Sequence, residues 1–346
     1  MEMPDTVFAK IKGFCLKYQL PLLIALLVIL VVFPLFYSKS YFMGILCRIL
    51  LYSVLAGAVN SINGYSGQTC LGAAGFFAIG AYTEAILSVK LGWNFWLIIP
   101  AAGVISALVG LLLAWPTLKM SGIYLSIVTL GFSEIVRLLA LNWTALTGGP
   151  MGVKAIPVPI FFGIQIRNSR YYYYLFLALA VVFVFCTKRV IRSRVGRAWM
   201  SIREDPLASR SLGVEASKYK ALNFMYGAFW IGIAGAVYAP YVRFIDSTFF
   251  TLDEGFNILS MVIIGGQGTL VGPVVGSIIV NTLTEWLRPI GAWRMVAYAV
   301  LIIVMMWWRP QGLVGASDSV LAEGKIRSIF DKKRDKKATV PGEGSS

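Results

Sequence analysis

The stretch FWLIIPAAGVISALVGLLLAW, residues Phe95 to Trp115, does not contain a single charged side chain. An α-helix of roughly 20 apolar residues spans the hydrocarbon core of a bilayer, which is about 30 Å thick. Similar runs recur along most of the 346 residues, of which 58% are apolar and only 14% are charged, and the mean hydropathy is +0.75. The sequence therefore predicts an integral membrane protein without a soluble domain.

Reading the apolar runs against charged and turn-forming residues predicts an all-α polytopic membrane protein with about ten transmembrane helices. The first run is expected to stay in the mature chain, because it is long for a signal peptide and no cleavage-site pattern follows it. The ten runs are 20–37, 42–62, 69–89, 95–115, 123–141, 171–186, 221–242, 252–266, 270–286 and 293–308.

Charge asymmetry predicts how these helices are oriented. The loop 188–220 holds nine Lys or Arg against three acidic residues, an excess that is typical of the cytoplasmic side. The basic tail is assigned to the same side, so the short run 252–266 must cross together with its successor. The segment between Asn142 and Arg170 then lies outside. The predicted organisation is a cytoplasmic N-terminal segment (1–19), a transmembrane domain (20–310) that includes the loop 188–220, and a disordered cytoplasmic tail (311–346).

The residue inventory excludes most enzymatic chemistry. The chain contains no histidine, so no histidine can activate a nucleophile, relay a proton or bind a metal ion. A phosphate-binding loop of the G-x-x-x-x-G-K-[ST] type does not occur either. We therefore expect neither an enzyme nor a cofactor site, and no nucleic-acid partner despite the formal charge of +15, because the basic residues cluster at span ends. The cysteines are expected to be reduced and inert; they are Cys15, Cys47, Cys70 and Cys186.

Two glycine-rich breaks interrupt the apolar runs at comparable places in the two halves of the chain. They read NGYSGQTCLGAAG (63–75) and GGQGTLVGPVVG (265–276), which suggests a weak internal duplication. Transporters often place a pathway at interrupted segments of this kind, because unwound backbone is tolerated in a membrane only where it lines a cavity or packs against protein. In the second break Gly268, Gly272 and Gly276 are spaced by four, which predicts one helix face for close packing rather than for substrate contact.

Ionisable residues inside the predicted spans are few and are functional candidates by default. Glu134 and Arg137 lie three residues apart and are expected to pair on one helix face, whereas Glu84 has no local partner. Uncharged polar residues gather at the two breaks, which suits a neutral or zwitterionic solute better than an ion. The candidate pathway residues are Asn63, Gln68, Glu84, Asn257 and Gln267.

The predicted cytoplasmic loop contains SIREDPLASRSLGV (201–214), which has the start and stop signals of a short helix. Acidic residues precede a proline, and a glycine ends the segment. A permease driven by a separate ATPase needs a rigid element of this kind for the ATPase to grip. A solvated basic loop that only fixes topology would not need the proline and glycine. The candidate coupling residues are Arg203, Glu204, Asp205, Pro206, Leu207, Ala208, Arg210, Leu212 and Gly213.

Taken together, several motifs between residues 40 and 313 resemble the permeases of LIV-type ABC importers for branched-chain amino acids, and within that family the M-type subunit. One departure is that Cys70 and Ala73 stand where Ser and His are often seen, which leaves the solute open. The motifs are GYSGQTCLGAAGFFAIGAY (64–82), MSGIYLSIVTLGFSEIVR (120–137), NWTALTGGPMG (142–152), VGRAWMSIREDPLASRSLGV (195–214), IIGGQGTLVGPVVGS (263–277) and RPQGL (309–313).

The resemblance implies a bacterial inner-membrane permease with both termini in the cytoplasm. Its expected partners are a second homologous permease, two cytoplasmic ATPases that bind the ATP, and an external solute-binding protein. That protein is expected to dock at the external turn formed by Gly148, Gly149, Pro150, Met151 and Gly152. Two alternatives remain: a sugar or urea-type permease of the same superfamily, and an ion-coupled carrier that would use Glu84.

Overall fold

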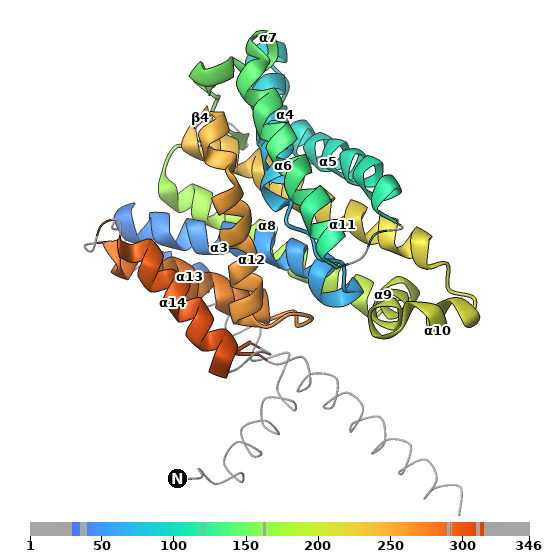
Figure 1. Ribbon diagram of the computed structural model, residues 1–346. Coiled ribbons are helices and arrows are strands. Elements are labelled where there is room, and N and C mark those ends of the chain that lie inside the picture. Colours follow the sequence, from blue (N-terminus) through green and yellow to red (C-terminus); the bar gives the residue numbers. More distant parts are fainter. Residues whose placement is uncertain are drawn as a thin grey trace, which may run out of the picture.

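The computed structural model describes residues 30–34, 40–118, 120, 122–161, 164–288, 291, 293–308 and 312–314 (Figure 1). The predicted N-terminal segment 1–19, most of the predicted first span 20–37 and most of the basic tail 311–346 lie outside these residues. The predicted boundaries of those three segments therefore stay predictions.

Among the described residues, six helices are long and apolar enough to cross a membrane. They match six of the expected spans, whereas three further apolar runs form shorter helices, so the expected number of about ten is not confirmed. The long helices are α3 (Ser40–Asn60, continued by the π-helix η1, Ser61–Tyr65), α4 (Ala73–Leu91), α5 (Phe95–Thr117), α6 (Ile123–Asn142), α8 (Ser169–Ile191) and α11 (Ala216–Val242); the shorter ones are α12 (Leu252–Gly265), α13 (Gly272–Trp286) and α14 (Trp293–Trp308).

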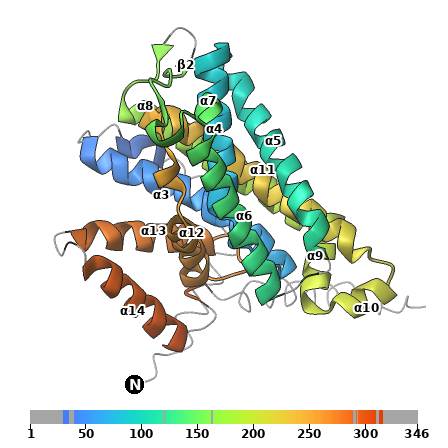
Figure 2. The same ribbon diagram turned by 45° about the horizontal axis from the view of Figure 1, so that its top comes forward.

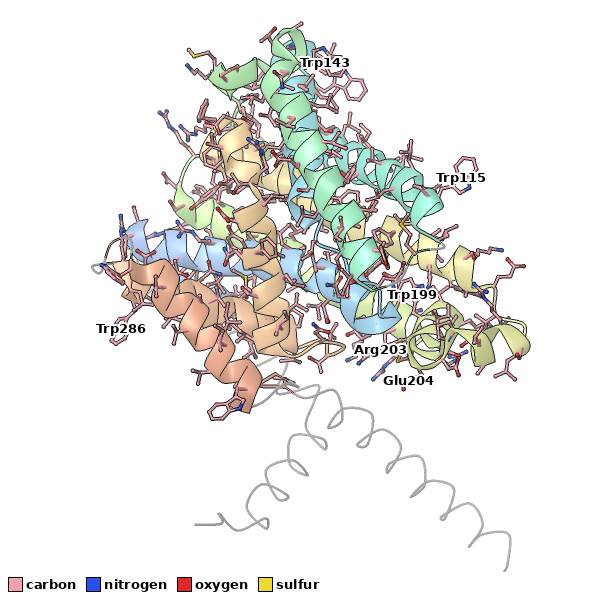
Figure 3. All side chains as sticks on the ribbon, viewed as in Figure 1. Trp115, Trp143, Trp199, Arg203, Glu204 and Trp286 are labelled. Carbon is pink, nitrogen blue, oxygen red and sulfur yellow. The ribbon has the colours of Figure 1, made fainter. Side chains whose placement is uncertain are left out.

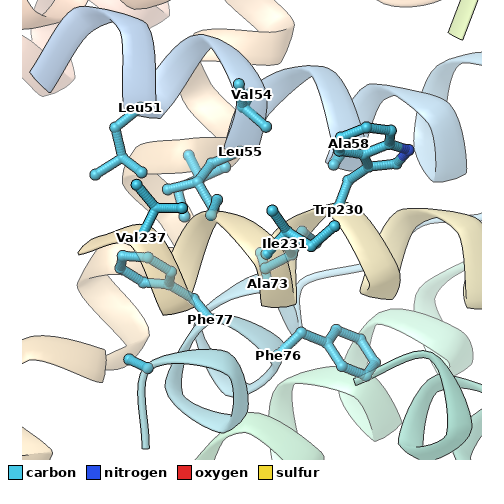
Figure 4. Close-up of a cluster of buried hydrophobic side chains, with 14 of the residues drawn as sticks. Leu51, Val54, Leu55, Ala58, Ala73, Phe76, Phe77, Trp230, Ile231 and Val237 are labelled. Atoms are coloured by element: carbon cyan, nitrogen blue, oxygen red, sulfur yellow. The ribbon is translucent and has the colours of Figure 1, made fainter. Parts of the chain in front are cut away.

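Helix α11 lies at the centre and packs against α3, α4 and α5 (Figures 1 and 2). Glycines allow the closest approach, since a Cβ on Gly235 would lie 2.8 Å from the backbone nitrogen of Ala81, and a Cβ on Gly80 would overlap the backbone of Gly232. Small residues at helix crossings are how membrane helices gain packing contacts, because lipid supplies no hydrophobic drive for association. Figure 4 shows the resulting core between these helices, with Leu55, Phe77 and Ile231 among its buried members.

Helices α12 and α13 form a tight pair that runs beside α3. A Cβ on Gly276 would lie 3.0 Å from the backbone nitrogen of Gly265, so glycine is required at this crossing. Helix α13 is antiparallel to α3: the Ser277 and Ser53 hydroxyls are hydrogen-bonded at 2.6 Å, and Tyr41 donates to Glu285 near the far end. The shorter α13 therefore runs along most of the length of α3.

Gly268 does not share a helix face with Gly272 and Gly276, which corrects the expectation from their spacing. Helix α13 begins only at Gly272. Both Gly266 (φ 113°) and Gly268 (φ 75°) adopt backbone conformations incompatible with a right-handed helix. Gly272 and Gly276 do lie at a close helix contact, as predicted.

Short elements cap the two ends of the molecule. One end carries α7 (Thr144–Thr147), the 3₁₀ turns η2 (Gly149–Met151) and η3 (Ser247–Phe250), and two antiparallel strand pairs, β1 (Val153–Lys154) with β4 (Phe244–Ile245) and β2 (Ile160–Phe161) with β3 (Ile164–Gln165). The opposite end carries α9 (Arg194–Glu204) and α10 (Pro206–Ser211) (Figures 1 and 2). The loops expected outside and inside the membrane are thus at opposite ends.

Candidate functional site

The two glycine-rich breaks meet although they lie far apart in the sequence. The Asn60 side chain contacts the second break twice: its Oδ1 accepts from the Gly268 backbone nitrogen at 2.8 Å, and its Nδ2 donates to the Thr269 carbonyl oxygen at 2.8 Å. A Cβ on Gly64 would lie 2.9 Å from the Gly268 Cα, so the backbones touch directly. We call this contact, formed by Asn60, Gly64, Gly268 and Thr269, the break junction.

Arg203 connects the break junction to the loop between α8 and α11. It lies in the last turn of α9, and its Nη1 donates a hydrogen bond to the carbonyl oxygen of Gly64. A Cβ on Gly67 would lie 3.2 Å from the Arg203 Cγ, and a Cβ on Gly268 would overlap the guanidinium. Figure 3 labels Arg203 and Glu204 at the end of α9. One side chain therefore contacts both breaks.

The sequence around Arg203 folds as its punctuation predicts. Asp205 caps α10, because its Oδ1 accepts from the backbone nitrogens of Leu207 and Ala208 at 2.8 and 3.0 Å, and Pro206 occupies the first turn. Gly213 follows the helix with φ 82°, a conformation that favours glycine. The predicted helix over 204–213 is thus confirmed for Pro206–Ser211, although Glu204 is the last residue of α9 rather than the start of α10.

Helix α10 exposes its apolar side chains. Leu207 and Leu212 are 75% and 82% exposed. The other side is fixed to α9, since the buried Ser209 hydroxyl is hydrogen-bonded to Ser201 at 2.6 Å. Helix α9 is in turn anchored on α11 by the buried Trp199, whose Nε1 donates to the Tyr219 carbonyl oxygen at 2.9 Å. The pair α9–α10 is therefore a supported element that presents two leucines and the exposed Arg210 outward.

Three of the five candidate pathway residues lie at or beside the break junction, but two of them serve the fold there. Asn63 accepts from the Cys70 backbone nitrogen at 3.0 Å, and Gln68 donates to the Ser66 hydroxyl at 2.7 Å, so both buried amides organise the first break. The third, Gln267, belongs to the second break and is exposed beside Gly268. Asn257 is half-buried on α12, and Glu84 lies in the half of α4 that is farther from the junction.

The charged residues of the long helices divide into paired and unpaired groups. Glu134 and Arg137 form the predicted ion pair, with Arg137 Nε donating to Glu134 Oε2 at 2.9 Å. The Glu84 side chain is only 1% exposed, and its Oε2 has no hydrogen-bond partner among the described residues. It lines a cavity of about 770 Å³ at the end of the molecule that carries α7. A buried carboxylate without a partner is unfavourable unless a ligand or proton compensates it.

The turn at residues 148–152 is tightly constrained. Gly148, Gly149 and Gly152 all have positive φ, and a Cβ on Gly152 would lie 2.9 Å from the Asp246 Cβ in the neighbouring segment. Pro150 restricts the turn further, and Met151 is 66% exposed at its tip. The turn therefore presents one large apolar side chain on a rigid backbone.

Comparison with known proteins identifies the family. A family model described as "Branched-chain amino acid transport system / permease component" matches residues 41–306. The chain belongs to this permease family. The permease is 36% identical over 334 residues to the high-affinity branched-chain amino acid transport system permease protein LivM of Salmonella typhimurium, and equally to LivM of Escherichia coli, covering 90% of this chain and 78% of each relative.

Other relatives are more distant. The permease is 25% identical over 229 residues to a probable branched-chain amino acid transport permease protein LivM of Methanocaldococcus jannaschii, covering 62% of this chain and 66% of the relative. It is 26% identical over 230 residues to the autoinducer 2 import system permease protein LsrC of Salmonella paratyphi B, covering 64% of this chain and 60% of that protein. No solved structure was found to match this permease.

Two features of the permease site do not follow from the sequence reasoning. Asn60 is a polar residue beside the first break, but its pairing with Gly268 and Thr269 joins residues that no local pattern connects. The sequence places Arg203 on the surface of the cytoplasmic loop and gives no indication of its contact with Gly64. The one sequence feature that singles out Arg203 is its position two residues before Asp205, the N-cap of α10.

A cysteine at Met151 of the permease is expected to react with a membrane-impermeant thiol reagent added from outside intact cells, because the side chain is exposed at the tip of the turn. The matched control is a cysteine at Leu207, which is similarly exposed at the opposite end and should react only after permeabilisation. The measurement is gel-shift labelling in a chain without its native cysteines. The reverse labelling pattern would invert the predicted orientation.

Proposed function

We propose that this chain is the transmembrane permease subunit of an ATP-driven importer for branched-chain or related hydrophobic amino acids. The observation that carries the proposal is 36% identity over 90% of the chain to permeases named for high-affinity branched-chain amino acid transport. The helical, apolar fold, with six helices of spanning length in the described part of the chain, agrees with a multi-pass membrane subunit. The chain acts as a transporter subunit and not as an enzyme, and ATP is bound by partner ATPases.

In this proposal the pair α9–α10 is the ATPase contact on the cytoplasmic face. The supporting observations are the exposed Leu207 and Leu212, the capped ends of α10 and the anchoring of α9 by Trp199. An element that must transmit motion has to be rigid, and these contacts give the pair fixed positions relative to α11. With α10 inside, both chain termini are cytoplasmic and the turn 148–152 faces the external solute-binding protein.

A second homologous permease completes the membrane part of the proposed importer. Helix α6 supports a partner of this kind, because only 22% of its most apolar 18-residue stretch is buried within the chain. The ion pair of Glu134 and Arg137 lies on this helix with both side chains partly exposed. Charged side chains within spans normally face protein or water rather than lipid, so a second subunit covering this part of α6 would lower the energy of the pair.

Another solute remains a second candidate. The similarity to autoinducer 2 import permeases, 26% identity over 64% of the chain, favours the broader description of an importer whose external binding protein selects the solute. Both candidates share the ATPase contact and differ only in the cargo. Competition for uptake between leucine and sugar-like solutes separates them.

Uptake of leucine, isoleucine or valine by the reconstituted importer is expected to require ATP and to persist when the proton gradient is collapsed. The chain has no histidine, and no acid relay is evident in the sequence that could couple protons to transport. The measurement is radiolabelled uptake into proteoliposomes that contain the permease with its ATPase, with ADP in place of ATP as the control. Uptake that follows the proton gradient without any ATPase would contradict the proposal.

A further inference from the structure

The cavity beside Glu84 combines features of a small-molecule site. It lies between the last turns of α4, the turn that follows them, the start of α5 and the loop 157–160, and its volume is about 770 Å³. The loop is tied to α5, because Trp96 Nε1 donates to the Ile160 carbonyl oxygen at 2.9 Å. The cavity is therefore bounded by two helices and by a loop whose position is fixed.

One wall of the cavity carries a buried carboxyl group that no cationic side chain of the described residues pairs with. Glu84 is 1% exposed, and its Oε2 has no hydrogen-bond partner among the described residues. The ion pairs formed within the described chain use other acidic residues, Glu134 and Glu285. A ligand cation would supply the partner that the protein does not provide, since a buried carboxylate favours a paired state.

Another part of the lining is the N-terminus of α5. The cavity is lined by Asn94, Phe95 and Trp96, which form the N-terminal cap and first turn of the 23-residue helix α5. The Asn94 side chain caps this helix by accepting from the Trp96 backbone nitrogen at 3.3 Å, and the helix dipole additionally favours an anion such as a carboxylate at this end. Phe95, Trp96 and Val158 add apolar surface to the lining. A zwitterion with an apolar side chain matches all three surfaces.

We infer that this cavity is a receiving site for a free, zwitterionic amino acid on the external side of the permease. The ligand ammonium pairs with the Glu84 carboxylate, the ligand carboxylate lies at the first turn of α5, and the side chain packs on Phe95 and Trp96. This inference rests on the proposed function, and it places the first contact of the cargo with this chain away from the break junction.

The test is equilibrium binding of radiolabelled leucine to the purified complex of the permeases and ATPases without the solute-binding protein, with competition by two analogues that each lack one charge. Isopentylamine lacks the carboxylate and 4-methylpentanoate lacks the ammonium, so both should compete more weakly than leucine. In Glu84→Gln, leucine affinity should fall about tenfold or more, as expected for loss of a charge-assisted bond, whereas 4-methylpentanoate should be unaffected or bind better. The matched control Asp253→Asn removes an exposed carboxylate at the start of α12 and should leave binding unchanged.

A second variant tests leucine binding in the cavity without changing Glu84. Val158→Trp fills the cavity from the loop and should block leucine binding without changing the buried carboxylate. Unchanged leucine affinity in both variants would overturn the inference, as would isopentylamine competing as strongly as leucine, which would indicate a site for amines such as a partner's lysine. The proposed function would be intact if the wild-type importer still took up leucine with ATP, and it would fail separately if leucine were not transported at all.

Discussion

Replacing Leu207 and Leu212 together by aspartate is expected to abolish copurification of the ATPase and transport-coupled ATP hydrolysis, while the permease itself remains folded in the membrane. Both side chains are largely exposed, so the folded chain loses little when they are changed. Burial of a leucine side chain at an interface contributes about 1.5–3 kcal/mol, so losing two should weaken docking at least about a hundredfold. Placing two carboxylates in the interface adds a desolvation penalty.

The matched control for this double variant is Arg210→Ala, which changes an exposed charge on the same helix. An exposed ion pair contributes about 1 kcal/mol or less, so this variant should retain most of the bound ATPase. The measurement is the ATPase recovered with a tagged permease, together with hydrolysis in proteoliposomes. Full retention of both by the Leu207→Asp, Leu212→Asp variant would show that α10 is not the ATPase contact.

Gly272→Leu is expected to destabilise the pair α12–α13 and to eliminate transport. A Cβ at this position would lie 3.0 Å from the Gly265 carbonyl oxygen and would also overlap the Gly266 carbonyl and the Thr269 hydroxyl. Backbone atoms cannot rotate away as a side chain can, so the helices must separate and lose their packing. Overpacking of a tight contact costs about 1–3 kcal/mol, and here a hydrogen bond between Gly272 and Thr269 is threatened as well.

For the melting temperature of the purified chain the control is Gly131→Leu on α6, because a Cβ there would meet nothing within 4 Å in the chain. Its uptake is not compared, because this part of α6 is the proposed contact with the second permease. Both substitutions place the same side chain at a helical glycine, but only the first introduces a clash. The measurements are the melting temperature of the purified chain and uptake by the reconstituted importer. A wild-type melting temperature and normal uptake for Gly272→Leu would mean that α12 and α13 can separate without consequence.

Local sequence signals predict the parts of the structure that depend on neighbours in the chain. The uncharged run at Phe95–Trp115 forms α5, Pro206 and Gly213 delimit α10, and the spacing of Glu134 and Arg137 gives an ion pair. Hydropathy, capping and helix periodicity act over a few residues, which is why a single sequence reveals them.

Contacts between distant segments cannot be predicted in the same way. Spacing by four suggests that Gly268 continues the helix face of Gly272, but spacing does not reveal a positive φ. The close crossing of α4 and α11 at Gly80 and Gly235 depends on which helices become neighbours. Glu84 is recognisable as an unpaired acid, yet the cavity beside it also needs the separate loop that ends at Ile160, and hydropathy does not bring these segments together.

The position of Arg203 bears on how a movement of α10 would reach the rest of the molecule. Its guanidinium holds Gly64 and lies against Gly268, while the residue two positions later caps α10. If α10 moves when an ATPase acts on it, we expect Arg203 to pass that movement to both glycine-rich breaks at the same time, because its side chain contacts both of them. The expected result is that the two breaks move together although the ATPase contacts only one loop of this chain.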